Sequence, residues 1–123
     1  LQPPPDTPGI WFAQLPPRGS DAPLTGRLTG HDPGRYRILV YIRVDGAGGW
    51  YTKPTAAAPA TPIDADGRWR CDITTGGLDA QASEVAVFAV PAGLEPPILL
   101  GEPALPQSLR DAAVEHQRAY RLP

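Results

Sequence analysis

The residue pattern of segment 35–44, RYRILVYIRV, constrains the fold more than any other part of the chain. Its apolar and polar residues alternate with a period of two, which is typical of a β-strand. One face would carry only β-branched residues, from Ile38 to Val44. The other face would carry Arg37, Leu39, Tyr41 and Arg43. We therefore expect a half-buried strand that presents Tyr41 and Arg43 on its outer face.

Shorter segments with strand-like composition recur along the chain, and turn-forming sequences such as HDPG (31–34) and DADG (64–67) separate them. Several short strands at a spacing of roughly 8–12 residues favour a sandwich of two sheets. We predict an all-β, immunoglobulin-like β-sandwich of about seven short strands. At most one short helix is expected, near the C-terminus. The expected strands are 24–29, 35–44, 50–53, 60–63, 68–73, 85–90 and 115–122, and the expected helix is 107–113.

The chain of 123 residues fits a single domain with a proline-rich start. Residues 1–8, LQPPPDTP, are typical of a semi-rigid spacer. Ile10 to Phe12 form either a first short strand or an apolar tether. We therefore divide the chain into a linker and N-terminal strand region, 1–23, and a β-sandwich domain, 24–123. Because Leu1 is not a translation start, we expect a processed protein or a piece of a longer one.

Charge and hydropathy argue against several classes of partner. The net charge is −2, and no cluster of Lys or Arg forms a basic stripe, so nucleic acid is not an expected partner. The apolar runs are far shorter than the roughly 18 residues that indicate a membrane span. We therefore expect no membrane insertion.

Catalytic and metal-binding patterns are weak in this sequence. The three serines lie outside any G-x-S-x-G elbow. Two histidines and one cysteine without close spacing do not match a zinc site. The segment Asp64-x-Asp66-Gly67 resembles the first half of a calcium loop, but Asp and Gly are also what a tight turn requires. We expect a turn there, no metal, no cofactor and no enzymatic activity.

The aromatic residues are the candidates for ligand binding. Trp69 alternates with Cys71 and Ile73, which predicts a core position. Trp50 and Tyr51 are adjacent, and adjacent strand residues point to opposite faces. We expect Trp50 to point inward and Tyr51 outward, on or beside the surface of Tyr41. Either this surface is an ordinary packed edge, or it is a ligand-binding patch formed by Tyr51, Tyr41, Trp50, Arg43 and Lys53.

The middle of the chain also carries a recognisable pattern. It runs through YRILVYIRVDGAGGWYTKP, PIDADGRWRCDITTGG and ASEVAVFAVPAGLEPP. This pattern resembles a small immunoglobulin-like β-sandwich accessory domain of bacterial secreted and envelope proteins, which is often attached to polysaccharide-active enzymes. The resemblance covers roughly residues 24–100 and implies no catalytic residue. The matching residues are Tyr36, Val40, Tyr41, Trp50, Tyr51, Pro54, Asp66, Gly67, Trp69, Val90 and Pro91.

Together these observations predict a non-catalytic, extracytoplasmic accessory domain that binds polysaccharide through exposed aromatic residues. The alternative is a structural spacer or protein-interaction module without a small ligand. The expected partner is then a polysaccharide or a neighbouring domain of the parent protein. The exposure of the rings distinguishes the two functions, because a ring must be accessible to stack on a sugar.

Overall fold

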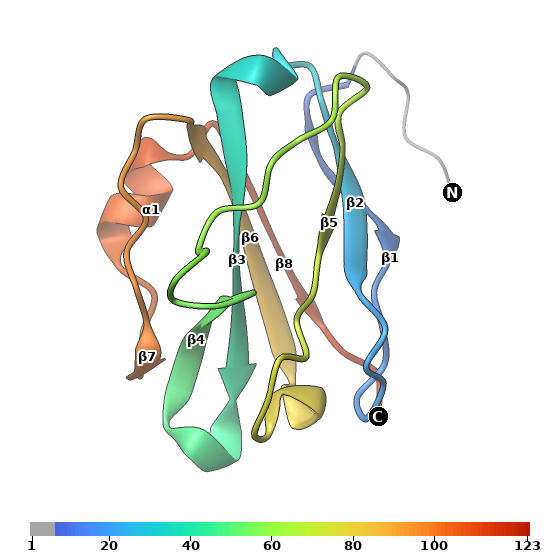
Figure 1. Cartoon of the computed structure of the whole chain (residues 1–123), viewed down its shortest axis with the longest axis vertical. Helices are drawn as coiled ribbons and strands as arrows, with labels where there is room; N and C mark the ends of the chain where they lie inside the picture. The colour runs from blue at the N-terminus through green and yellow to red at the C-terminus, as the bar shows by residue number, and fades with distance from the viewer. Residues whose placement is uncertain (1–6) are drawn as a thin grey trace.

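The structure, a computed structural model, describes residues 7–123, so most of the predicted linker lies outside the described residues. The chain folds into two antiparallel β-sheets that pack face to face (Figure 1). The smaller sheet has three strands in the order β1-β2-β5. Its strands are β1 (Gly9–Gln14), β2 (Leu24–Thr29) and β5 (Arg68–Cys71).

The larger sheet has five strands in the order β7-β4-β3-β6-β8. The long strands β3 and β6 occupy its centre, and the short strands β7 and β8 form its edges. A single short helix, α1 (Gln107–Ala112), lies against the side of this sheet that faces away from the smaller sheet (Figure 1). The strands are β3 (Tyr36–Val44), β4 (Gly49–Lys53), β6 (Glu84–Pro91), β7 (Leu100–Glu102) and β8 (Glu115–Tyr120).

This arrangement confirms the predicted all-β sandwich and its short helix near the C-terminus. The first, second and fifth strands form one sheet, and the third, fourth, sixth and last strands belong to the other. An immunoglobulin-like sandwich distributes its strands in this way. The described residues contain eight strands rather than about seven.

Three elements differ from the expectation. Residues 60–63 form no strand, and Thr61 contributes only an isolated bridge to Ile38. Strand β7 was not predicted, because a three-residue segment with a central glycine carries no period-two signal. For residues 10–12 the strand alternative holds, since β1 pairs with β2 over most of its length. The first strand of the sandwich thus precedes the boundary placed at residue 24.

The main hydrophobic core lies between the two sheets. Strand β3 contributes Ile38, Val40 and Ile42, all fully buried. From the smaller sheet, Trp69 extends into the same core and is only 3% exposed, which confirms its predicted position. Its indole lies over Gly26, where any Cβ would come within 2.4 Å of the ring. The interior of the sandwich is therefore built around one tryptophan and the residue opposite it.

A second core covers the other face of the five-stranded sheet, and this corrects the prediction of a half-buried β3. Leu39 and Tyr41 point away from the smaller sheet, yet Tyr41 is only 1% exposed. The long connection from β6 to β8 folds back over them and brings Leu99 and Leu109 into contact with this face. The hydroxyl of Tyr41 donates a hydrogen bond to the Pro97 carbonyl at 2.8 Å. Strand β3 is thus buried on both faces.

We predict that Trp69→Ala destabilises the domain by about 3–5 kcal/mol, the usual cost of removing a large aromatic side chain from a core. The change would leave a cavity beside Gly26 that the two sheets cannot close. Chemical denaturation monitored by circular dichroism measures this loss. Trp11→Ala is the matched control, because Trp11 lies on the outer face of the same sheet. Equal losses in the two variants would contradict this assignment of faces.

We predict that the Cys71 thiol is inert in the native protein. The side chain is buried in the main core, and burial raises its pKa to about 11. Almost none of the thiol is therefore ionised at neutral pH, and the thiolate is the reactive form. A chromogenic thiol reagent should modify it only after denaturation. Reaction of the folded protein at the rate of free cysteine would disprove this prediction.

Candidate functional site

The predicted accessible patch around the WYTKP segment does not form, because Tyr41, Trp50 and Lys53 are buried and Tyr51 packs on the inner face of β4. Trp50 pairs with Arg43, so it shares the face of Tyr41. Tyr51 pairs with Ile42 and packs, half-buried, against the core between the sheets. The predicted directions of the two rings are therefore reversed.

Trp50 is buried in a stack of charged and aromatic groups. The guanidinium of Arg118 lies over its ring, 5.2 Å from the centroid, and the indole is only 3% exposed. Arg118 Nε also donates to the buried carboxylate of Glu84 at 2.6 Å, and this hydrogen bond raises the pKa of Arg118. Arg43 forms an exposed ion pair with Asp45 at 3.1 Å. Of the five predicted ligand-binding residues, only Arg43 is exposed.

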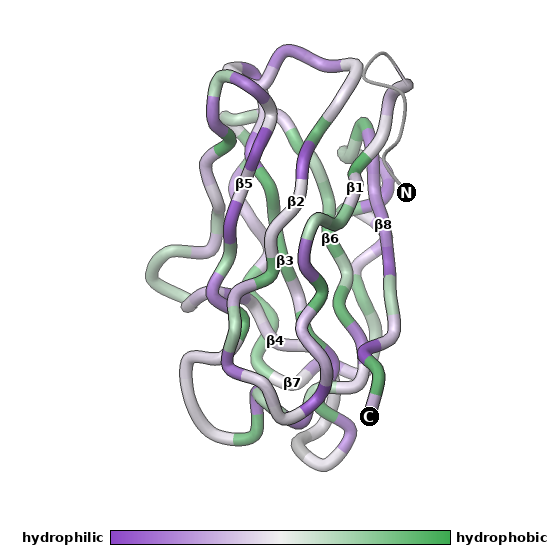
Figure 2. The backbone as a smooth tube through the Cα atoms, turned by 90° about the vertical axis from the view of Figure 1, so that its right-hand side faces the viewer, coloured by the Kyte–Doolittle hydropathy of each residue, from purple (hydrophilic) through white to green (hydrophobic). Residues whose placement is uncertain are grey.

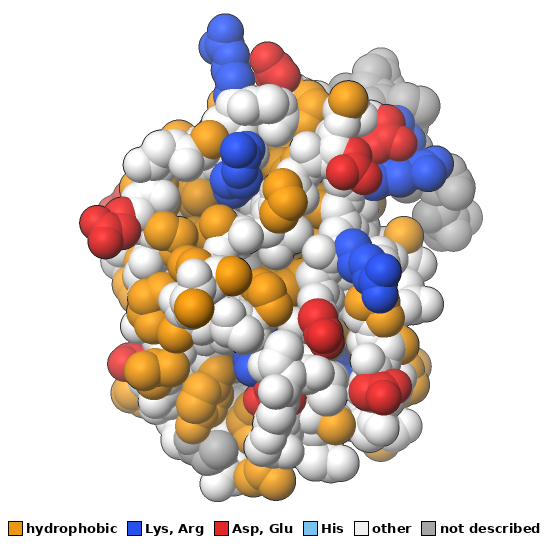
Figure 3. Space-filling model, viewed as in Figure 1, with side chains coloured by type: hydrophobic (Ala, Val, Ile, Leu, Met, Phe, Trp, Pro, Cys, Tyr) orange, Lys and Arg blue, Asp and Glu red, His pale blue; other side chains and the backbone are white. Residues whose placement is uncertain are grey.

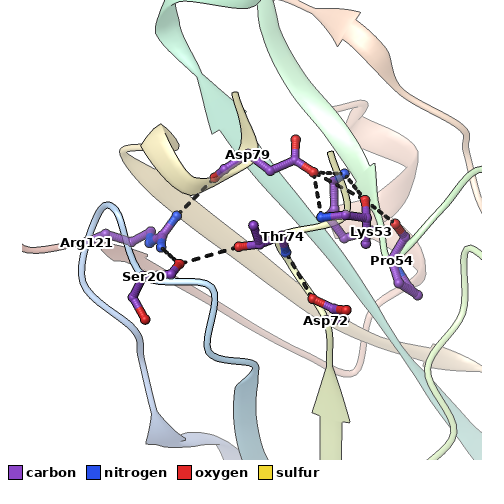
Figure 4. Close-up of polar contacts among 8 residues, drawn as sticks. Ser20, Lys53, Pro54, Asp72, Thr74, Asp79 and Arg121 are labelled. Carbon is purple, nitrogen blue, oxygen red and sulfur yellow. Dashed lines mark hydrogen bonds and ion pairs between the residues drawn. The ribbon is translucent and has the colours of Figure 1, made fainter. Parts of the chain in front are cut away.

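Lys53 is a structural residue at the base of the sandwich. The side chains of Lys53 and Asp79 form an ion pair at 2.5 Å, and the two residues are only 7% and 8% exposed (Figure 4). Lys53 Nζ also donates to the Thr75 hydroxyl at 2.8 Å. These bonds join β4 to the loop between β5 and β6. No sequence spacing indicated this pair.

Next to this pair, Arg121 closes the same end of the sandwich. Its buried guanidinium donates to the carbonyl of Asp79 and to carbonyls of the loop between β1 and β2, including Ser20 at 3.2 Å (Figure 4). Burial, followed by the charge of Arg18, lowers its pKa. The sequence placed Arg121 in an edge strand and gave no sign of this role.

A further aromatic ring on a sheet surface is that of Trp11, on the outer face of the three-stranded sheet. It is half-buried and lies flat on the backbone, because a Cβ at Gly9 would be 3.1, 3.2 and 3.3 Å from three atoms of the indole. The indole Nε1 donates a hydrogen bond to Thr29 Oγ1 at 2.8 Å. The sheet and this hydrogen bond fix the orientation of the ring.

Arginine side chains extend this surface across the other two strands. Trp11 lies opposite Arg27, which in turn lies opposite Arg68, so the three residues form one row across the sheet. Arg70 lies in the next row, opposite Thr25. Figure 2 looks onto this sheet and shows hydrophilic positions on β2 and β5 in front of the hydrophobic β3 and β6. On the right of Figure 3, where these strands lie, Lys or Arg side chains alternate with Asp or Glu side chains.

An open hollow of about 270 Å³ adjoins the row at the end of β2. Arg27 and Thr29 line one side of it, and Asp66 of the turn before β5 lines another. His31 also lines the hollow and contacts Glu115 at 2.8 Å through Nε2. We call the row, Arg70 and this hollow the Trp11 face. It offers one fixed aromatic ring and several charged groups on an open surface.

The sequence contained part of the signal for the Trp11 face. The alternation of residues 68–73 predicted that Arg68 and Arg70 lie on the face of the strand that points away from the Trp69 side. Because adjacent strand residues point to opposite faces, only one of Trp11 and Phe12 could point inward. Phe12 is the inward residue, with its ring centroid 6.4 Å from that of Trp69. The pairing of β1 with β2 and of β2 with β5, which assembles the face, is non-local and left no signal in the sequence.

No protein-family model, curated protein or solved structure matches the chain. Within residues 7–123, no helix is both long and apolar enough to cross a membrane. The same part of the chain holds no group of three or more His, Cys, Asp or Glu side chains placed to bind a metal ion. The DADG segment is a turn, in which the Gly67 amide donates to the Asp64 carbonyl at 2.8 Å.

We predict that Asp79→Ala destabilises the domain by about 3–5 kcal/mol, because it leaves the Lys53 ammonium buried without its partner. The double variant Lys53→Met with Asp79→Ala should recover a large part of this loss. Urea denaturation of the single and double variants gives the coupling between the two residues. Additive effects would show that the ion pair is not the source of the loss.

Proposed function

We propose that this domain is a non-catalytic accessory domain that binds polysaccharide on the Trp11 face. The observation that carries the proposal is the fixed, half-exposed indole of Trp11, which lies flat against Gly9 and is anchored to Thr29. A ring held in place before binding offers contact area at little entropic cost. The apolar face of a pyranose can stack on such a ring.

The surroundings of Trp11 supply the polar contacts that a sugar requires. Arg27 and Arg68 carry several N–H donors beside the ring, and Asp66 offers carboxylate acceptors at the edge of the hollow. The surface is open along the strands rather than enclosed. This shape suits a segment of an extended chain better than a small free sugar.

The likeness of residues 24–100 to accessory domains of secreted and envelope proteins supports an extracytoplasmic location. It also supports attachment to a neighbouring domain of a parent protein. Within that setting the domain would hold its parent near a polysaccharide.

A structural spacer or protein-interaction module is the second candidate, and the burial of the WYTKP segment favours it. Trp50 packs beneath Arg118, and Lys53 is paired with Asp79. These residues therefore stabilise the domain and are not accessible to a ligand. A domain whose aromatic residues stabilise its interior, as those of the WYTKP segment do, can act as a rigid connector between neighbouring domains.

We predict that Trp11→Ala weakens polysaccharide binding by roughly 1–3 kcal/mol, the scale of losing one aromatic residue at a binding hot spot. Affinity electrophoresis through gels that contain single soluble polysaccharides would identify a ligand and measure this change. Tyr120→Ala is the matched control, because Tyr120 is 72% exposed but lies on β8 of the other sheet. Its binding should equal that of the parent.

Two results would contradict the polysaccharide proposal. One is that no polysaccharide in a broad panel retards the parent domain. The other is that Trp11→Ala, with an unchanged circular dichroism spectrum, binds as well as the parent. Either result leaves the spacer or interaction module as the better account.

A further inference from the structure

The Trp11 face carries three arginines, Arg27, Arg68 and Arg70, in a chain whose net charge is −2. Arg27 and Arg68 lie directly opposite each other on β2 and β5, and Arg70 follows two residues after Arg68. Like charges in directly opposed positions destabilise a sheet. An arrangement that costs stability indicates a functional constraint. From this and the contacts below, we propose that the ligand of this face is an acidic polysaccharide whose sugars carry carboxylates; the inference rests on the proposed function.

The turn residue Asp66 orients two of the three guanidinium groups. Arg27 Nε donates to the Asp66 carbonyl at 3.0 Å, and Arg68 Nε contacts the Asp66 carboxylate at 3.3 Å. Both contacts use the Nε atom. Among the described residues the terminal nitrogens of these two side chains have no further hydrogen bond or ion pair. Asp66 thus holds Arg27 through its main-chain carbonyl and Arg68 through its carboxylate, and it leaves the paired terminal donors of both for a ligand.

The third guanidinium, that of Arg70, has no hydrogen bond or ion pair to any residue of the described part, 7–123. Its nearest acidic residue in sequence, Asp72, accepts a hydrogen bond from the Thr74 amide at 3.2 Å. Among residues 7–123, no acidic side chain forms an ion pair with Arg70, so its guanidinium donors are available to a ligand.

Uronate sugars match this arrangement. The carboxylate of a uronate projects from the edge of the pyranose ring, so the ring can stack on Trp11 while its carboxylate reaches a neighbouring guanidinium. Arginine binds carboxylates through two parallel N–H bonds, which gives both affinity and orientation. Successive uronates along a chain would meet Arg27 or Arg68 and then Arg70. A neutral sugar would leave these charges without a partner.

The test compares polygalacturonate with the same polymer after methyl esterification, which removes the charge and keeps the backbone. Alginate and a glucuronate-containing polymer, each with its esterified form, extend the comparison to other uronates. We expect the parent domain to bind at least one acidic polymer about tenfold more tightly than its ester, the scale of one charge-assisted hydrogen-bonded pair. Added salt should reduce this preference.

The variants separate charge recognition from stacking. Arg70→Gln and Arg27→Gln should each remove part of the roughly tenfold preference for the acidic polymer, and the double variant should remove it; each change should weaken binding to the acidic polymer more than binding to the ester. Trp11→Ala should weaken binding to both forms. Arg110→Gln, on the exposed side of helix α1, is the control and should behave as the parent. Thermal melts establish that each variant is folded.

The outcomes distinguish this inference from the proposed function. Binding to neutral polysaccharides alone, or to an acidic polymer and its ester equally, would overturn the inference and retain the proposed function. Binding to no polysaccharide would overturn both. Equal binding to single-stranded DNA of matched charge would also overturn the inference, because it would show a general preference for polyanions.

Discussion

The burial of β3 on both faces is the constraint on which the rest of the structure depends. One face supplies Ile38, Val40 and Ile42 to the core between the sheets, and the other supplies Leu39 and Tyr41 to the core under α1. A one-residue shift in the register of β3 would exchange these two sets and disturb both cores at once. The pairing of β3 with β4 and β6 is fixed by this double packing. The positions of Trp50, Tyr51 and Lys53 on β4 follow from it.

This double burial also explains why the aromatic pattern of the sequence does not mark the surface that we propose for ligand binding. The rings that follow the strongest strand signal, Tyr41 and Trp50, fill the second core. The ring on which the proposed function rests, Trp11, belongs to β1, which has a weaker strand signal. The connection 92–114 covers the outer face of the large sheet. In the described part of the chain, the outer face of the small sheet has no such cover and forms a flat, polar surface.

Much of the fold could be predicted from local pattern, whereas the candidate site could not. The period of two in β3 and β5 correctly placed Trp69 and Cys71 in the core. It could not show that the connection 92–106, rich in proline and without periodicity, folds over Tyr41. The pattern also did not determine which residues of β4 face the core between the sheets. Gly48 and Gly49 adopt positive φ values of 100° and 143° just before Trp50, and this turn sets the direction of the side chains that follow. The Trp11 face requires pairings between strands that are distant in sequence, and only the three-dimensional structure supplies them.

Arg121 joins parts of the domain that are far apart in the sequence. Its guanidinium connects the loop between β1 and β2 to the loop before β6, and its partner Pro16 lies 105 residues earlier. Strand β8, which brings Arg118 to the buried Glu84, follows the other seven strands of the described residues in sequence. A nascent chain that ends before β8 would expose the edge of β6 and leave that carboxylate without its closest partner. Closure of the sandwich therefore requires β8, and a chain without it presents an unpaired strand edge that can pair with other chains.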